Sequence, residues 1–263
     1  MHGGRNGLVT FWDVKTAHAT RAFRFADTVE EVAVSADGKL LAVQTQGARP
    51  ADAQVYVVQI GTGRVLQTHS LADPSHGVQF SGDGRGLIAL GCCQPGSTVV
   101  AWDIRSGRRL WHREGLDAAA MAITPDSRLL GLGTQDGKVL LLDPRTGQQT
   151  QPSLKALDGS IGILAFSPDG HDLAINGETV SLWDLRSRRR LGNPFGPYPA
   201  AIPQMVLEPN GRLLIVLLGN AEQWPTDAAT WERFACGIVG RNLTKAEWAD
   251  VLPTQAYQKV CEG

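Results

Sequence analysis

Residues 161–187 read IGILAFSPDGHDLAINGETVSLWDLRS, and this stretch contains the two landmarks that decide the fold. The first is the turn Ser167-Pro168-Asp169-Gly170, and the second is the pair Trp183-Asp184. An alternating apolar segment precedes the turn and a more uniformly apolar segment follows it, which predicts a hairpin of two short strands. The turn chemistry agrees, because proline presets φ, aspartate bonds nearby amides and glycine accepts a positive φ.

The same two landmarks recur along the chain in fixed phase. The aspartate of the turn recurs at steps of 46, 43, 43 and 41 residues, as Asp37, Asp83, Asp126, Asp169 and Asn210. The second landmark recurs as Trp12-Asp13, Trp102-Asp103, Leu142-Asp143 and Trp183-Asp184, with Val58-Gln59 as a degenerate copy. One four-stranded sheet of this size cannot bury both of its faces, whereas several packed around an axis can. The repeats therefore predict an all-β propeller.

The repeated units resemble WD repeats, most clearly over residues 126–147 and from Ser167 to Asp184. The resemblance covers residues 3 to about 224. It implies a WD-repeat-like β-propeller of about five four-stranded blades, in which the ring of blades need not be complete. The chain departs from the family because the Gly-His pair that usually precedes strand one is missing from every unit. The unit containing residues 102–111 is also similar to the repeats of quinoprotein-like propellers, which keeps that subfamily open.

We expect two parts, a propeller over residues 1–226 and a tail over 227–263. The expected blade units are 1–26 (partial), 27–72, 73–117, 118–157, 158–200 and 201–226. The first unit contains only segments typical of strands three and four, at residues 8–13 and 21–25. Two interpretations stay open: an N-terminal strand completes the last blade, or the chain is the C-terminal part, or a truncated fragment, of a longer signalling protein.

The tail predicts two short helices. Trp231, Phe234 and Ile238 form one apolar stripe, and Thr244-Lys245-Ala246-Glu247 is a capping box that opens the second helix. Residues 235–244, with Glu247-Trp248 and 257–261, resemble the end of large actinobacterial signalling proteins, which place a WD-repeat propeller after a signal-transduction ATPase module. This resemblance implies a sensor or scaffold role in bacterial signalling.

The composition bears on partners and location. A formal net charge of −1 gives no general attraction to nucleic acid or to anionic lipid, so we expect neither partner. The longest apolar run, residues 213–218, is too short to cross a bilayer, and the N-terminus lacks a signal pattern, so we expect a cytoplasmic location. The four cysteines lack metal or redox spacing, and we expect reduced thiols; whether Cys236 and Cys261 pair stays open.

The search for chemistry finds no catalytic, cofactor or metal motif. The sequence has no phosphate-binding loop with Lys-Ser/Thr, no His-Glu-x-x-His and no Gly-x-Ser-x-Gly, and its six histidines are scattered. We therefore expect a protein that is not an enzyme, has no cofactor, is monomeric or part of a larger chain, and binds other proteins. A small-molecule-binding or hydrolytic propeller is the alternative.

The expected binding surface lies where segments from several blades converge. In propellers, the connections between blades and the loops between strands two and three surround the mouths of the axial channel. The candidate residues in the connections are Asp27, Asp73, His76, Asp117 and Asp158. The candidate residues in the loops are Arg49, Gln94, Gln135 and Asn176.

Overall fold

The computed structural model of this 263-residue chain describes all residues except 1, 4–5, 50–51, 72–74, 92–95, 197–203, 217–219, 227–229, 231–232, 234–235, 237–239, 252–255, 260 and 262–263. For residues 2–3, 75–76, 195 and 249–251 only the backbone is described.

The described residues form six antiparallel sheets, called A to F in chain order, and each consists of strands that are consecutive in the sequence. Sheet A contains β1 (His2–Gly3), β2 (Leu8–Asp13) and β3 (His18–Arg24). Sheet B contains β4 (Thr28–Val34), β5 (Leu40–Gln46), β6 (Gln54–Gln59) and β7 (Val65–Ser70). Sheet C contains β8 (Ser75–Phe80), β9 (Gly86–Gly91), β10 (Thr98–Asp103) and β11 (Arg109–Arg113).

The second half of the array repeats the same plan. Sheet D contains β12 (Ala118–Ile123), β13 (Leu130–Thr134), β14 (Lys138–Leu142) and β15 (Gln149–Lys155). Sheet E contains β16 (Ile163–Phe166), β17 (Asp172–Asn176), β18 (Val180–Asp184) and β19 (Arg189–Phe195). Sheet F contains β20 (Gln204–Glu208), β21 (Arg212–Val216) and β22 (Ala221–Pro225).

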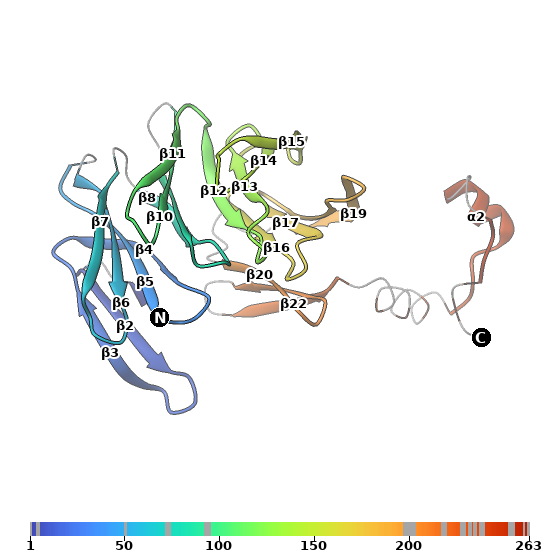
Figure 1. The fold of residues 1–263 in the computed structure, drawn as a ribbon. Coiled ribbons are helices and arrows are strands. Elements are labelled where there is room, and N and C mark those ends of the chain that lie inside the picture. The colour runs from blue at the N-terminus through green and yellow to red at the C-terminus, as the bar shows by residue number, and fades with distance from the viewer. Residues whose placement is uncertain are drawn as a thin grey trace.

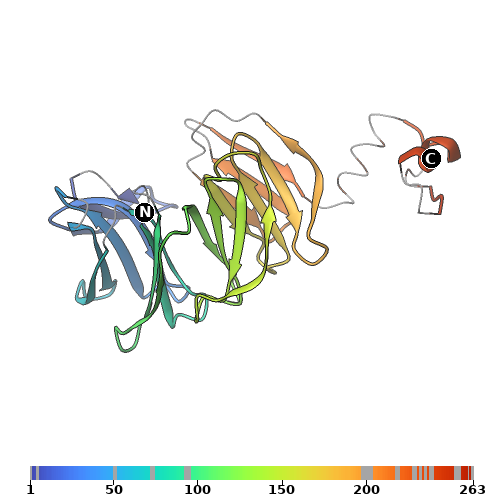
Figure 2. The same cartoon turned by 90° about the horizontal axis from the view of Figure 1, so that it is seen from above.

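The sheets follow one another in sequence order along a curved array (Figures 1 and 2). From sheet B to sheet F, consecutive sheets touch through their first strands: β4 contacts β8, β8 contacts β12, β12 contacts β16 and β16 contacts β20. One cluster of buried apolar side chains lies between each pair of consecutive sheets; between sheets B and C, for example, Val55 and Val57 pack with Leu87 and Ala89. The core is therefore divided among the seams of the array, as the repeat argument predicts.

The all-β, propeller-like fold with several four-stranded sheets is confirmed, and the expected blade count is not. The described residues hold four four-stranded sheets and two three-stranded sheets instead of about five four-stranded blades. Sheet A also has one more strand than its sequence indicates, because the two-residue strand β1 pairs with β2. The segment expected as a weak third strand in the last unit is β22, which pairs with β21 over its whole length.

The tail contains α2 (Lys245–Val251), which both views place apart from the sheets (Figures 1 and 2). The predicted capping box is confirmed, since the Thr244 amide donates to Glu247 Oε2 (2.7 Å) and the Glu247 amide donates to Thr244 Oγ1 (3.3 Å). The apolar stripe Trp231, Phe234 and Ile238 of the other expected helix lies outside the described residues, so α2 alone represents the predicted two-helix tail. Among the described residues, no helix has both the length and the apolar character needed to cross a membrane.

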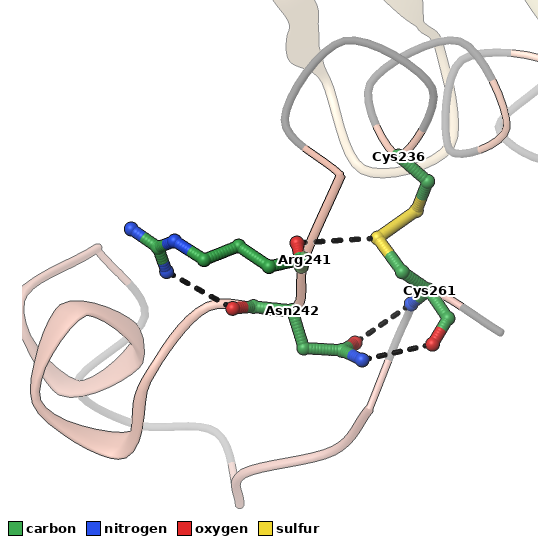
Figure 3. Close-up of a disulfide and its surroundings, with 4 residues drawn as sticks. All are labelled: Cys236, Arg241, Asn242 and Cys261. Carbon is green, nitrogen blue, oxygen red and sulfur yellow. Dashed lines mark hydrogen bonds between the residues drawn. A yellow bond between two sulfur atoms is a disulfide. The ribbon is translucent and has the colours of Figure 1, made fainter. Parts of the chain in front are cut away.

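A disulfide closes the tail between Cys236 and Cys261, whose Cα atoms are 5.4 Å apart (Figure 3). The side chain of Asn242 supports it, because its amide donates to the Cys261 carbonyl (2.8 Å) and its oxygen accepts from the Cys261 amide (2.7 Å). The question whether Cys236 and Cys261 pair, which the sequence leaves open, is answered by this bond, and the two are not reduced thiols in this structure. The two residues are separated by 25 positions in the sequence, so their proximity depends on how the tail folds back.

Candidate functional site

The aspartates of the repeated turns hold the hairpins together. Ser167 Oγ donates to Asp169 Oδ1 (2.6 Å) and accepts from the Asp172 amide (2.8 Å). Hydrogen bonds from Ser167 and from the His171 amide keep the pKa of Asp169 below its ordinary value. The same serine or threonine to aspartate bond is present at residues 35 and 37, 81 and 83, and 124 and 126. These carboxylates are committed to the turns, so they offer no paired general acid and base.

Because neighbouring strands are antiparallel, the segments that join them lie alternately at the two opposite ends of the strands. In the names that follow, an edge means one of these two rows of strand ends and not an outermost strand. The turns between strands one and two and between strands three and four lie at one edge, which we call the turn edge. The loops between strands two and three and the connections between sheets lie at the opposite edge, which we call the loop edge. The seven candidate residues that the structure describes, Asp27, Arg49, His76, Asp117, Gln135, Asp158 and Asn176, belong to the loop edge, because they stand in or beside these two kinds of segment.

The first pair of candidates lies at the loop edge of sheet B. Arg49 is exposed, but its guanidinium donates two hydrogen bonds to Asp52, from Nε to Oδ2 (3.1 Å) and from Nη2 to Oδ1 (2.8 Å). This contact lowers the pKa of Asp52 and raises that of Arg49. Asp27 is half-buried beside the same loop, since a Cβ on Gly47 would lie 3.5 Å from its Oδ1. Arg49 is therefore tied into its own loop.

The second pair lies at the loop edge of sheet D. The backbone amide of Gln135 donates to the backbone carbonyl of Asp117 (3.0 Å). This bond joins the loop to the connection that precedes the sheet. Asp117 has a positive φ of 48°, an uncommon conformation for a residue other than glycine, and its neighbour Ala118 donates from its amide to Ser97 Oγ (2.7 Å). Both candidate side chains are exposed.

The third pair lines one pocket at the loop edge of sheet E. Asp158 from the connection and Asn176 from the end of β17 both border a cavity of about 470 Å³. Its lining residues are Leu157, Asp158, Gly159, Ser160, Gly162, Asn176, Gly177, Glu178 and Thr179. A volume of this size is within the range of ligand-binding pockets. Here the two kinds of segment chosen from the sequence meet around an open space.

Asn176 is the most unusual side chain of this pocket. It is only 6% exposed, and its Nδ2 has no hydrogen-bond partner within the described part of the chain. Three further buried atoms share this condition, namely Gln44 Oε1, Thr45 Oγ1 and Gln46 Oε1 at the end of β5. All four atoms lie on loop-edge ends of second strands. Because a buried polar group without a partner costs free energy, each of these atoms would gain from a partner such as water, an ion or a ligand.

Three candidates cannot be placed in the same detail. Asp73 and Gln94 lie outside the described residues. His76 belongs to β8, but only its backbone is described. The candidates that can be placed therefore form three pairs, at sheets B, D and E, and in each pair a connection meets the loop of the sheet that it leads into.

A second, smaller pocket of about 240 Å³ lies at the turn edge, between sheets C and D. Two of its four charged side chains are already paired with each other, because Arg145 Nη2 lies 3.0 Å from Asp83 Oδ2. The Asp83 amide also donates to Ser127 Oγ of the next sheet (3.0 Å). These bonds explain the pocket as a hydrogen-bonded seam between two sheets.

The sequence reasoning missed a set of side chains that link neighbouring sheets. Arg21, Gln67 and Trp111 each stand eight residues after the second landmark of their unit, on the outer strand. Each donates to a carbonyl in the following sheet: Arg21 to Ile60, Gln67 to Ile104 (2.5 Å) and Trp111 to Pro144 (2.9 Å). The constant offset from the landmark is the signal that could have revealed them. No group of three or more histidine, cysteine, aspartate or glutamate residues within the described ranges is placed to hold a metal.

Comparisons with known proteins agree with this architecture. A family model, PQQ_2, described as outer membrane protein assembly factor BamB, matches residues 6–153. WD repeat-containing protein SL1-17 of Schistosoma mansoni is 30% identical over 152 residues, which cover 52% of this chain and 48% of that protein. Protein LST8 homolog of Drosophila pseudoobscura pseudoobscura is 25% identical over 87% of this chain and 76% of its own length. The resemblance to WD-repeat propellers is thereby confirmed.

The solved structures add a likeness of fold. The β-propeller domain of Cps50 (Swd1) from Myceliophteria thermophila superposes with a TM-score of 0.63, at 17% identity, over 85% of this chain and 78% of that domain. A guanine nucleotide-binding protein subunit beta from Nicotiana plumbaginifolia is 26% identical over 54% of this chain and 40% of its own length. The matched stretches thus span less than half of several of the curated relatives.

Proposed function

This chain belongs to the PQQ_2 family, described as outer membrane protein assembly factor BamB, and from that membership we propose that it is a non-catalytic propeller that binds other proteins. The observation that carries the proposal is the loop edge, where four buried polar atoms at the ends of β5 and β17 have no partner within the described chain. By their printed descriptions, the matching family acts in the assembly of outer membrane proteins, and the guanine nucleotide-binding protein β subunit is one part of a larger protein.

We place the partner-binding surface on the loop edge, with Asp27, Asp117 and Asp158 as its acidic positions. These three come from three different connections, so a partner that touched all of them would cross several sheets. Charge reversal of all three to lysine tests the surface. The side chains of Asp117 and Asp158 are exposed, so their replacement leaves the buried seams intact.

The experiment compares proteins retained from source-cell lysate by the immobilised wild-type chain and by the triple variant, quantified by mass spectrometry. We expect a small set of proteins that the wild type retains and the variant loses. Equal retention by both would remove the loop edge as the binding surface, and retention of nothing by either would count against the protein-binding function itself. A variant with Lys15 and Lys39 changed to glutamate, at the turn edge, is the control.

The family match over residues 6–153 also favours a second function, the binding of a small molecule by a quinoprotein-like propeller. Titration of the full chain with pyrroloquinoline quinone, followed by absorbance and calorimetry, tests it. A saturable signal at one site per chain would favour this function over the protein-binding one. No heat and no spectral change would remove it.

We further propose that the propeller, residues 1–226, and the tail, residues 227–263, act together as a sensor or scaffold in bacterial signalling. The support is the tail sequence around Cys236, Arg241 and Trp248, which resembles the end of actinobacterial signalling proteins. The compartment follows from the state of the Cys236–Cys261 disulfide, because such bonds persist in oxidising surroundings and are rare in the cytosol. Alkylation in intact cells, followed by mass spectrometry of the peptides that contain Cys236 and Cys261, tests this: labelling of these two cysteines supports a cytoplasmic location, and their protection counts against it.

A further inference from the structure

The pocket of sheet E exists because its loop is shorter than the equivalent loop of sheet D. In sheet D, Gly133 is paired with Val139 and the loop contains the five residues between them. In sheet E, Asn176 is paired with Val180 and the loop contains three. Asn176 therefore occupies the position of Gly133, and the shorter loop leaves the space above it open.

The two equivalent positions have different neighbours. A Cβ on Gly133 would lie 2.4 Å from Ile161 Cγ2, so an apolar side chain from the following connection fills the space there. The position that corresponds to Ile161 in the connection after sheet E is residue 202, which lies outside the described residues. On the side of the preceding connection, Asn176 lies beside Gly162, where an added Cβ would lie 3.8 Å from Asn176 Oδ1 with no closer described atom. The Gly162 amide holds the Asn176 carbonyl at 2.8 Å. The Asn176 backbone is thus fixed, and Nδ2 of its side chain is buried beside the cavity.

The rim of the cavity is acidic. Asp158 and Glu178 are both exposed, and they approach the pocket from the connection and from the loop respectively. The neighbouring cation is Lys155, whose Nζ lies 3.5 Å from Asp158 Oδ1 and donates to the Asp136 carbonyl (2.8 Å). Lys155 is therefore anchored on sheet D, and the Glu178 side of the pocket faces no cation among its lining residues.

We propose that this pocket binds the side chain of an arginine or lysine presented by an extended segment of a partner protein. The cation lies between the carboxylates of Asp158 and Glu178, and a peptide carbonyl beside it accepts a hydrogen bond from Asn176 Nδ2, which is buried in the free protein and becomes accessible when its side chain turns toward the pocket. The arrangement satisfies the unpartnered donor and brings opposite charges together, whereas an acidic segment would meet two carboxylates. This inference rests on the proposed protein-binding function and specifies the chemistry of one contact.

The probe is the capped tripeptide acetyl-Gly-Arg-Gly-amide, and its matched control is acetyl-Gly-Glu-Gly-amide. The full chain is labelled with ¹⁵N, and the reporters are the backbone amides of Gly162, Gly177 and Glu178 and the side-chain amide of Asn176. We expect the arginine peptide to shift these resonances saturably and the glutamate peptide to leave them unchanged. The double variant Asp158→Asn with Glu178→Gln should weaken binding about fivefold, since each exposed ion pair contributes roughly 0.5 kcal/mol.

Two further variants keep the test independent of folding defects. Gly162→Ala adds a methyl group in ordinary contact distance of Asn176 and should weaken binding by covering its amide. Glu114→Gln removes an exposed carboxylate outside the pocket lining and should leave binding unchanged. Equal shifts with both peptides, absence of shifts, or an undiminished affinity in the double variant would overturn the proposal. If lysate partners still depend on the loop edge in that case, the proposed function stands and only this contact fails.

Discussion

The loops of sheets D and E occupy the same place in two neighbouring sheets and have opposite chemistry. In sheet D, Thr134 Oγ1 donates to Asp136 Oδ1 (2.5 Å) and accepts from the Lys138 amide (3.0 Å). Lys138 Nζ completes the loop at 2.6 Å from Asp136 Oδ2. In sheet E the loop of residues 177–179 is closed by a backbone bond from the Gly177 amide to the Thr179 carbonyl (3.0 Å), and Nδ2 of the adjacent Asn176 has no partner in the part of the chain that the structure describes.

The difference assigns two roles to the same loop of the repeat: the loop of sheet D stabilises the fold, and the loop of sheet E is available for binding. A loop whose polar atoms are all bonded internally rigidifies the sheet and has little left to offer a ligand. A loop that leaves a buried donor without a partner loses stability, and a ligand can recover that loss by accepting the bond. We therefore expect substitutions in the loop of sheet D to act on unfolding, and substitutions in the loop of sheet E to act on binding.

The largest effect is expected from Gly137→Ala in the loop of sheet D. Gly137 has a φ of +78°, and an added Cβ would lie 2.1 Å from the Leu157 carbonyl oxygen. Strain and collision with backbone together should lower the free energy of unfolding by about 3 kcal/mol, measured by urea denaturation. The control is Gly38→Ala, with a φ of +70° and no atom within 4 Å of the new methyl group, which should cost about 1 kcal/mol. Equal losses would show that the contact with residue 157 is unimportant.

The next effect is expected from Thr134→Val, which keeps the shape of the side chain and removes its hydroxyl. Thr134 is buried, so the Lys138 amide and the Asp136 carboxylate would lose a partner that water cannot fully replace. The free energy of unfolding should fall by about 2 kcal/mol. Thr179→Val in the loop of sheet E is the matched change and should alter it by less than about 0.5 kcal/mol. A reversed order would contradict the comparison.

The loop of sheet D should also make the free energy of unfolding depend on pH in the acidic range. Hydrogen bonds from Lys138 and Thr134 lower the pKa of Asp136 from 3.8 to about 2. A carboxyl group whose pKa is lowered by folding stabilises the protein above its unfolded pKa, and that contribution disappears as the pH falls from about 4 to about 2. In Asp136→Asn the unfolding free energy should therefore decline less steeply over this range, as measured by urea denaturation at each pH. Parallel curves for the wild type and the variant would disprove the linkage.

The sequence predicted the sheets well, because the repeated turns impose a local geometry that four copies of a serine or threonine to aspartate bond confirm. It also identified the loop edge, since the order of antiparallel strands alone decides which segments meet there. The individual candidates were harder to rank. The sequence does not distinguish Arg49 from Asn176, and only the structure shows that Asp52 engages the Arg49 guanidinium while Asn176 Nδ2 has no partner among the described residues.

The remaining features depend on residues that are distant in the sequence. The pocket beside Asn176 combines the short loop after β17 with Gly162 of the preceding connection, where an added Cβ would lie 3.8 Å from Asn176 Oδ1. The disulfide joins residues 25 positions apart through a fold of the tail that the spacing of cysteines does not specify. The links from Arg21, Gln67 and Trp111 become visible as a repeat only when the acceptor carbonyls of the next sheet are known.

The smallest effect on stability is expected from Asn176→Leu. The substitution removes a buried donor that has no acceptor, so the unfolding free energy should stay within about 1 kcal/mol of the wild-type value or rise. The same change should lower the affinity for the arginine tripeptide, because the peptide carbonyl would lose its hydrogen bond to residue 176. Urea denaturation and the ¹⁵N titration measure the two quantities on one sample. A loss of stability comparable to that of Thr134→Val would mean that Asn176 supports the fold as its counterpart loop does, and the separation of the two roles would be wrong.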